Sequence, residues 1–207
     1  MSPEIWLAFA GASALLLAIP GPTVLLVLSY ALARGRMAAL PMAAGVAAGD
    51  FTAMTLSLLG VGALLATSAT LFTALKLAGA AYLVWLGIRL WTSSDGSNLP
   101  TASDATPSGH MFGHAWLVTT LNPKSIVFFV AFTPQFVDPA GSYAAQAVTM
   151  LVTFVGLAYL NALAYALFGA RARRFMRSKR AMRAVNRGGG AALIGAGAAT
   201  AAFGRAP

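Results

Sequence analysis

Apolar residues fill six long stretches of the chain, and polar residues gather in the short segments between them. Each stretch approaches or exceeds the roughly 20 residues that an α-helix needs to cross a hydrocarbon layer. The strict alternation of apolar and polar positions that marks strands of a membrane barrel is absent from the sequence. The pattern predicts an all-α integral membrane protein with six transmembrane helices, at residues 5–32, 39–66, 69–91, 112–133, 143–169 and 188–203.

Composition supports a membrane protein and removes several kinds of chemistry. Of the 207 residues, 58% are hydrophobic and 9% are charged, with a mean hydropathy of +0.75, which is more apolar than one water-soluble core can accommodate. The sequence has no cysteine, so disulfides, thiol redox reactions and thiolate metal sites are excluded. We expect the first apolar stretch to be a retained helix, because it is about twice as long as the apolar core of a signal peptide.

The positive charge is concentrated in one segment. Eight of the fourteen basic residues lie in the run 171–187, which contains no acidic residue. Such a run predicts a cytoplasmic loop that contacts anionic lipids, and Arg34 and Arg36 then lie on the same side. Both termini are predicted outside, with the protein in the bacterial inner membrane. A nucleic-acid surface is not expected, because Phe175 is the single aromatic residue in the run.

A polar stretch at residues 93–111, rich in Gly, Ser, Thr and Pro, follows the third predicted helix. It divides a single membrane domain into two three-helix halves, residues 1–92 and 112–207. Because each half has an odd number of spans, two halves with one fold would cross the membrane in opposite directions. The sequence therefore predicts two inverted repeats.

The first and fourth predicted helices, which correspond under this repeat, each contain a motif that interrupts a helix. Proline removes an amide donor and clashes with the preceding turn, and glycine adds backbone freedom. A lone proline is most often an ordinary kink, but paired breaks in corresponding helices favour a substrate site between the repeats. The residues at the two breaks are Pro20, Gly21, Pro22, Asn122, Pro123 and Lys124.

Two charged residues are predicted deep in the membrane. Asp50 and Lys124 each lie about eleven residues into a span, roughly 17 Å deep at about 1.5 Å per residue. An ionised side chain costs about 2.5–3.5 kcal/mol there, so such residues face a polar cavity, titrate or pair with each other. Transport and a structural ion pair both fit these two residues. Asn161, midway along the fifth span, could line a cavity or bond a neighbouring helix.

Catalytic and metal chemistry find little support in the sequence. His110 and His114 are four residues apart, a spacing that can hold a metal ion on a helix, but a third ligand is missing. We expect a wetted pair at the membrane edge and no metal site. Asp50 is the single acidic residue deep in a span, and a hydrolytic constellation is absent. The protein is therefore expected to be no enzyme and to need no cofactor.

Four stretches carry a resemblance to a known family: AIPGPTVLLVLSYALARGR, GVAAGD, KLAGAAYLVWLGIRLW and LNPKSIVFFVAFTPQFVDP. The chain resembles the LysE/RhtB family, the lysine-exporter and homoserine/threonine-resistance translocators of bacterial inner membranes. The resemblance implies secondary active export of amino acids or their derivatives by exchange with protons, through six spans in two repeats. By motif position it also adds Pro134 and Gln135 to the candidate site residues.

These observations suggest one mechanism. A zwitterionic amino acid would bind between the two broken helices, with its carboxylate near Lys124 or a half-helix N-terminus. Its ammonium would lie near exposed carbonyls or Asp50, and a proton entering from outside would neutralise Asp50. The alternatives are a channel, an exporter of metal ions or other small solutes, and a non-transporting membrane scaffold. Gly-rich helix faces permit a homodimer without requiring one.

Overall fold

The computed structural model of the chain describes residues 1–92, 108–169, 171 and 178–203. Within these residues every regular element is a helix, which confirms the predicted all-α fold. Most of the predicted linker 93–111 lies outside the described residues, and its last four residues belong to a helix. The elements are α1 Pro3–Ala18, α2 Pro22–Arg34, η1 Gly35–Ala38, α3 Ala39–Thr67, α4 Ala69–Thr92, α5 Ser108–Thr120, α6 Pro123–Phe132, η2 Thr133–Phe136, α7 Tyr143–Leu167 and α9 Lys179–Phe203.

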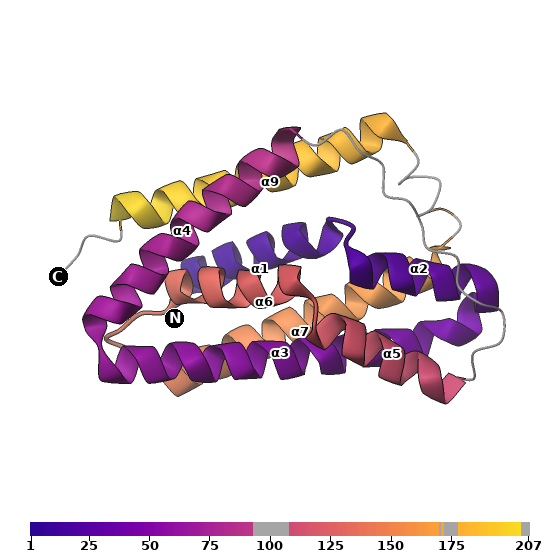
Figure 1. Cartoon of the computed structure of the whole chain (residues 1–207), viewed down its shortest axis with the longest axis horizontal. Coiled ribbons are helices and arrows are strands. Elements are labelled where there is room, and N and C mark those ends of the chain that lie inside the picture. Colours follow the sequence, from indigo (N-terminus) through magenta and orange to yellow (C-terminus); the bar gives the residue numbers. More distant parts are fainter. Residues whose placement is uncertain (93–107, 170, 172–177, 204–207) are drawn as a thin grey trace.

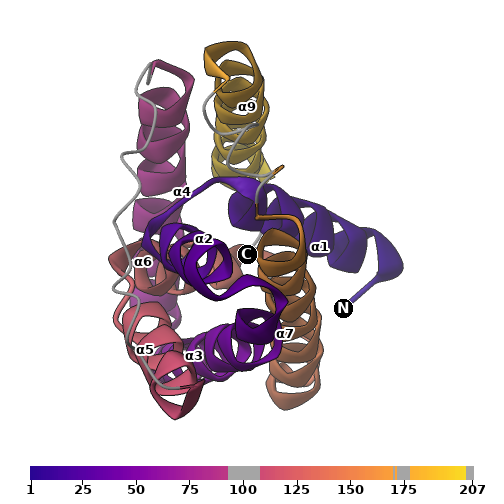
Figure 2. The same cartoon turned by 90° about the vertical axis from the view of Figure 1, so that its right-hand side faces the viewer.

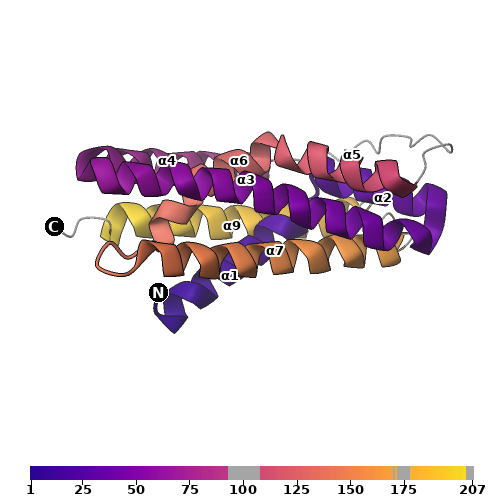
Figure 3. The same cartoon turned by 90° about the horizontal axis from the view of Figure 1, so that it is seen from below.

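The helices form an elongated bundle in which α3 and α7 are central. α3 packs on α5, α6 and α7, and α7 also packs on α1 and α2. Figure 3 shows α3, α4 and α7 running along the length of the molecule. α4 and α9 pack against each other, and Figure 2 shows this pair standing to one side of the other helices.

Both interruptions that the sequence predicts are present. α1 ends at Ala18 and α2 begins at Pro22, while α5 ends at Thr120 and α6 begins at Pro123. Each proline occupies the first position of its helix, where an amide donor is not needed. Figure 1 shows both breaks about halfway along the long axis. The two half-helices of each pair therefore meet near the centre of the molecule.

The last helix begins earlier than the sequence predicts. α9 starts at Lys179, so the prediction of a loop over 179–187 was wrong. The segment KRAMRAVNR is rich in Lys, Arg, Ala and Met, which favour helices strongly, so the helix continues past the apolar residues. Arg180, Arg183 and Arg187 remain exposed on this extension, while residues 172–177 of the basic run lie outside the described residues.

Length and composition identify two stretches among the described residues that could each cross a membrane, Pro22–Thr67 and Tyr143–Leu167. A third follows if His110–Thr120 and Lys124–Phe136, which are bent by 48°, count as one span. α1 is apolar but has only 16 residues. This measure alone does not establish the six predicted spans.

Aromatic side chains hold α6 against α1 and α7. Phe128 and Phe132 stack with their ring centroids 4.2 Å apart, and Phe129 meets Phe154 of α7 edge-on at 4.8 Å. Phe9 of α1 stacks on Phe132 at 6.1 Å. All five rings are almost completely buried. This cluster fixes the half-helix that follows the second break.

A close backbone approach joins α3 to α5 beside Asp50. A Cβ atom at Gly49 would lie 2.7 Å from Thr119 Cβ and 2.8 Å from the Trp116 carbonyl oxygen. Only glycine leaves room for this contact. The crossing therefore fixes the position of the next residue, Asp50, relative to α5.

Gly49→Ala should lower the free energy of unfolding by about 1–3 kcal/mol, because the added methyl group overpacks the α3–α5 crossing. The matched control is Gly156→Ala on α7, where an added Cβ meets nothing within 4 Å. This control should be neutral or slightly stabilising, since alanine favours a helix. Thermal unfolding of the purified variants in detergent compares the two, and equal midpoints would contradict the close crossing.

Candidate functional site

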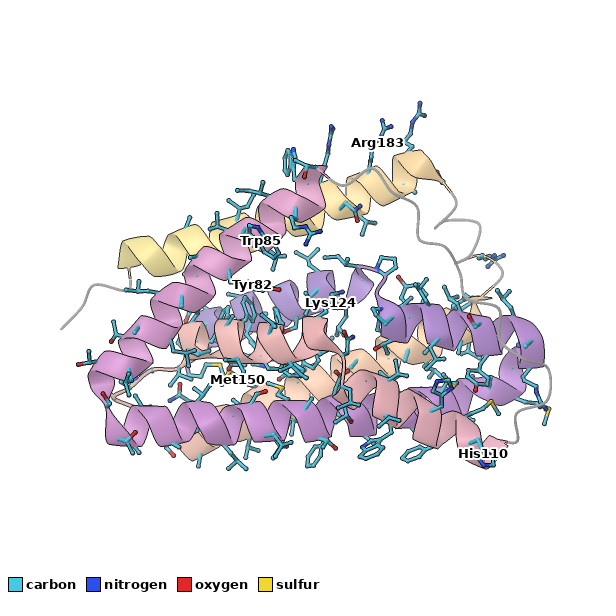
Figure 4. All side chains as sticks on the ribbon, in the orientation of Figure 1. Tyr82, Trp85, His110, Lys124, Met150 and Arg183 are labelled. Atoms are coloured by element: carbon cyan, nitrogen blue, oxygen red, sulfur yellow. The ribbon has the colours of Figure 1, made fainter. Side chains whose placement is uncertain are left out.

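A cavity of about 40 Å³ lies between the two helix breaks. Its walls come from α1, α2, α3, α6 and α7, and therefore from both halves of the chain. Figure 4 shows Lys124 in the middle of the molecule, where α6 faces the α1–α2 break. The polar residues that line the cavity are Thr23, Asp50, Asn122, Lys124, Ser125, Asn161 and Tyr165.

The end of α1 is the first feature of this cavity. The last carbonyls of a helix have no partner within the helix and carry a partial negative charge. The Lys124 ammonium donates hydrogen bonds to the carbonyl oxygens of Leu16, at 3.0 Å, and Ile19, at 2.8 Å. A cation from the second half of the chain therefore caps a broken helix of the first half.

Two neutral side chains of α7 cap the carbonyls in between. Asn161 Nδ2 donates to the Leu17 carbonyl at 3.2 Å, and the Tyr165 hydroxyl donates to the Ala18 carbonyl at 3.1 Å. Tyr165 follows Asn161 by one helical turn, so both side chains lie on the same face of α7. Together with Lys124 they satisfy four consecutive carbonyls, and Asn161 lies in the cavity wall while it bonds the neighbouring helix α1.

Asp50 enters the cavity from α3. Its side chain is only 2% exposed, and Oδ1 has no hydrogen-bond partner among the described residues. The Ser125 hydroxyl lies within hydrogen-bonding reach of the carboxyl, and the Lys124 ammonium interacts with it electrostatically. A buried carboxyl with one oxygen unpartnered is costly, which makes Asp50 a candidate for contact with a ligand or a proton.

Hydrogen bonds also join the two breaks directly. Asn122 Nδ2 donates to Thr23 Oγ1 at 3.2 Å, and Asn122 Oδ1 accepts from the Lys124 amide at 3.1 Å. Thr119 Oγ1 donates to the same Thr23 oxygen at 3.4 Å. Asn122 thus caps α6 and at the same time holds the first turn of α2.

The structure brings together some of the sequence-predicted site residues and leaves others elsewhere. Those that line the cavity are Gly21, Asp50, Asn122, Lys124 and Asn161. Those that set the breaks or lie in η2, away from the cavity lining, are Pro20, Pro22, Pro123, Pro134 and Gln135. Gln135 Nε2 donates to the Ala131 carbonyl at 2.9 Å. His114 Nδ1 hydrogen-bonds the Tyr30 hydroxyl at 3.0 Å, far along α5 from the cavity.

Three polar lining residues were not among the predicted site residues. Thr23 and Ser125 lie in the first turns of the half-helices that follow the breaks, and Tyr165 lies one turn after Asn161. A polar residue directly after a break, or one helical turn from another polar residue in a span, is the signal that would have identified them. The assembled site offers an ammonium, a carboxyl, amides and hydroxyls, which suits recognition of a small polar solute.

Comparison with known proteins finds one matching family model and several relatives of this chain. The family model described as LysE type translocator matches residues 14–202 of the chain. A homoserine/homoserine lactone efflux protein of Salmonella typhimurium is 32% identical over 198 residues, which cover 96% of this chain and 96% of that protein. A leucine efflux protein of Enterobacter sp. is 31% identical over 187 residues, 89% of this chain and 88% of that protein. An uncharacterized membrane protein of Vibrio cholerae is 33% identical over 197 residues, 95% of this chain and 96% of that protein. No solved structure matches the chain.

Tyr165→Phe should lower the free energy of unfolding by about 1–3 kcal/mol, because the Ala18 carbonyl loses its donor inside the bundle. Tyr159→Phe is the matched control on the same helix, since its hydroxyl has no hydrogen bond among the described residues. Thermal unfolding in detergent should separate the two variants. Equal destabilisation would mean that the cap at Ala18 contributes nothing to stability.

Proposed function

The chain belongs to the LysE type translocator family, and on that premise we propose that it is a secondary active transporter that exports amino acids or their derivatives from the bacterial cytoplasm. The observation that carries the proposal is the cavity between two broken helices, with Asp50 and Lys124 in its wall. Broken helices that meet near the centre of the membrane are the usual construction of a transporter site. No covalent step is needed for this function, and the protein is not an enzyme.

The proposed architecture is six spans in two inverted repeats. In such a repeat, α1 and α2 of the first half correspond to α5 and α6 of the second half. In the same way, α3 corresponds to α7 and α4 corresponds to α9. The main packing pairs support it, because α3 packs on α5, α6 and α7 while α7 packs on α1, α2 and α3. α4 and α9, which correspond to each other in this repeat, also pack against each other.

The proposed topology places both termini outside and residues 171–187 on the cytoplasmic side of the inner membrane. Arg34 ends α2 and Arg36 follows in η1. Arg36 and Arg171 line the same pocket, and Figure 1 shows the end of α2 away from the marked N and C ends of the chain. Basic residues accumulate on the cytoplasmic side of membrane proteins, where they contact anionic lipid headgroups. This side would be the one from which the substrate enters.

The proposed substrate is a small amino acid. One relative is named for efflux of homoserine and homoserine lactone, and another for efflux of leucine. The molecules in these names share an α-amino group, and homoserine and leucine also carry a carboxylate. Lys124 and Asp50 supply the opposite charges that a zwitterion requires. The site would therefore recognise the amino and carboxylate groups that amino acids share, rather than the substrate's side chain.

The proposed cycle is alternating access coupled to protons. One half would rock against the other around the cavity and open it first to the cytoplasm and then to the outside. A proton that enters from outside would neutralise Asp50 and weaken its attraction for the positive groups in the cavity, which favours release of the substrate. Each charge moved through the membrane potential contributes about 2.3 kcal/mol per 100 mV, which is enough to drive export against a gradient.

Asp50→Asn should leave a folded protein that still exchanges substrate but no longer responds to a proton gradient, because the amide cannot take up a proton. The measurement is efflux of a panel of labelled amino acids, homoserine and leucine among them, from proteoliposomes with and without an inward proton gradient. Glu4→Gln, an exposed carboxyl near the N-terminus, is the matched control and should retain the acceleration.

Loss of exchange and coupling together in Asp50→Asn would assign a structural role to the carboxylate. Wild-type flux that ignores the gradient would indicate a channel. If the wild-type protein moves no amino acid in either condition, the export function is wrong.

A further inference from the structure

The carbonyls at the end of α1 do not all need a charged partner, because neutral side chains can cap such groups as well. Asn161 and Tyr165 already cap Leu17 and Ala18 with neutral donors. The remaining two carbonyls, of Leu16 and Ile19, accept from the Lys124 ammonium. Carbonyls at the end of a half-helix form a binding site for a cation, because they combine unpaired oxygens with the negative end of the helix dipole.

We propose that the ammonium group of the transported amino acid and the ammonium of Lys124 compete for the carbonyl oxygens of Leu16 and Ile19, so that substrate entry displaces Lys124. The inference rests on the export function proposed above and names the group that the substrate must replace. Lys124 is then a built-in substitute for the substrate's cation, held in the site by the chain itself.

The position of Lys124 supports displacement. Its ammonium lies 3.0 Å from the Leu16 carbonyl oxygen and 2.8 Å from the Ile19 carbonyl oxygen. A second ammonium group cannot reach the same two oxygens while Lys124 keeps its place. Lys124 is the lining side chain best able to move, since its ammonium sits on a flexible four-carbon stem. Gly21 lies beside that stem and has no side chain to confine it.

Asp50 gives the displaced ammonium a destination. Its carboxyl interacts electrostatically with Lys124, and Oδ1 has no hydrogen-bond partner among the described residues. A zwitterionic substrate offers Lys124 a second partner, its own carboxylate. A substrate with an ammonium but without a carboxylate, such as an amino lactone, displaces Lys124 and offers it nothing in return.

This difference makes the proposal testable with two ligands. In Lys124→Met the competing cation is gone, so homoserine lactone should bind about tenfold more tightly than to the wild type, the factor expected for hydrogen bonds to a charged group. Homoserine should bind more weakly, because its carboxylate loses Lys124. Isothermal titration of the purified, monodisperse protein in detergent measures both affinities.

Two further variants test the cause of this change. Lys124→Arg keeps the charge and should hold the lactone affinity near the wild-type value. Arg89→Met removes a cation that lies over the Trp85 ring, outside the cavity, and should change neither affinity.

Three outcomes separate the inference from the function on which it rests. In the first outcome, the wild type binds homoserine, but Lys124→Met binds the lactone no more tightly than the wild type does. This result overturns the competition and leaves the export function intact. A wild type that binds neither ligand overturns the export function, and the competition falls with it. If Lys124→Met does not fold, the wild type gives the answer, because the sequence has only three lysines, Lys76, Lys124 and Lys179.

Lysine-selective isotope labelling then gives an NMR signal for each of them, and the Lys124 signal is the one that Lys124→Arg removes. Saturating homoserine lactone should shift this signal. A Lys124 signal that stays in place while the lactone binds would overturn the inference.

Discussion

A helix broken inside a hydrocarbon layer leaves backbone carbonyls that water cannot reach, and the rest of the site depends on how these carbonyls are satisfied. Each unpartnered group costs several kcal/mol in such surroundings. Here α1 ends with four consecutive carbonyls, and all four accept hydrogen bonds from side chains of α6 and α7. The Leu16 carbonyl also accepts from the Ile19 amide at 3.2 Å, but the carbonyls of Leu17, Ala18 and Ile19 depend on side chains that the second half of the chain supplies. One constraint of backbone chemistry thus creates both the cavity and the contact between the halves.

The bundle combines a rigid part with a part that can rearrange. The aromatic cluster of α1, α6 and α7 and the close crossing of α3 and α5 are packed side chain to side chain, and such packing resists continuous deformation. The cavity between them is held by hydrogen bonds and by charges that can exchange partners. Movement of a solute through the protein would therefore alter the polar contacts of the cavity first. The aromatic cluster and the α3–α5 crossing would move as rigid bodies.

The sequence predicted the features that are local. Pro22 and Pro123 stop a helix from continuing unbroken through their positions, and a carboxylate such as Asp50 in an apolar stretch is visible from hydropathy alone. It did not predict which atoms Lys124 would contact, because its partners are backbone carbonyls more than 100 positions away and any residue type supplies a carbonyl. Gln135 was carried over by motif alone, and such a match does not say which cavity a side chain reaches. The start of α9 was misplaced because a basic segment has low hydropathy and high helix propensity at once.

The division of labour at the end of α1 has a consequence for how the chain can diverge. All the acceptors there are main-chain atoms, and apart from the Ile19 amide, which also donates to the Leu16 carbonyl, the donors are the side chains Lys124, Asn161 and Tyr165. Residues 16–19 are therefore free to change their identity, provided that they remain apolar and keep their backbone path. The donor side chains cannot change in this way without loss of a hydrogen bond. At this junction the residue identities of the second half of the chain are therefore more constrained than those of the first half. A chimaera that takes its first half from a distant relative would preserve this junction, whereas one that takes its second half from elsewhere would have to bring matching donors with it.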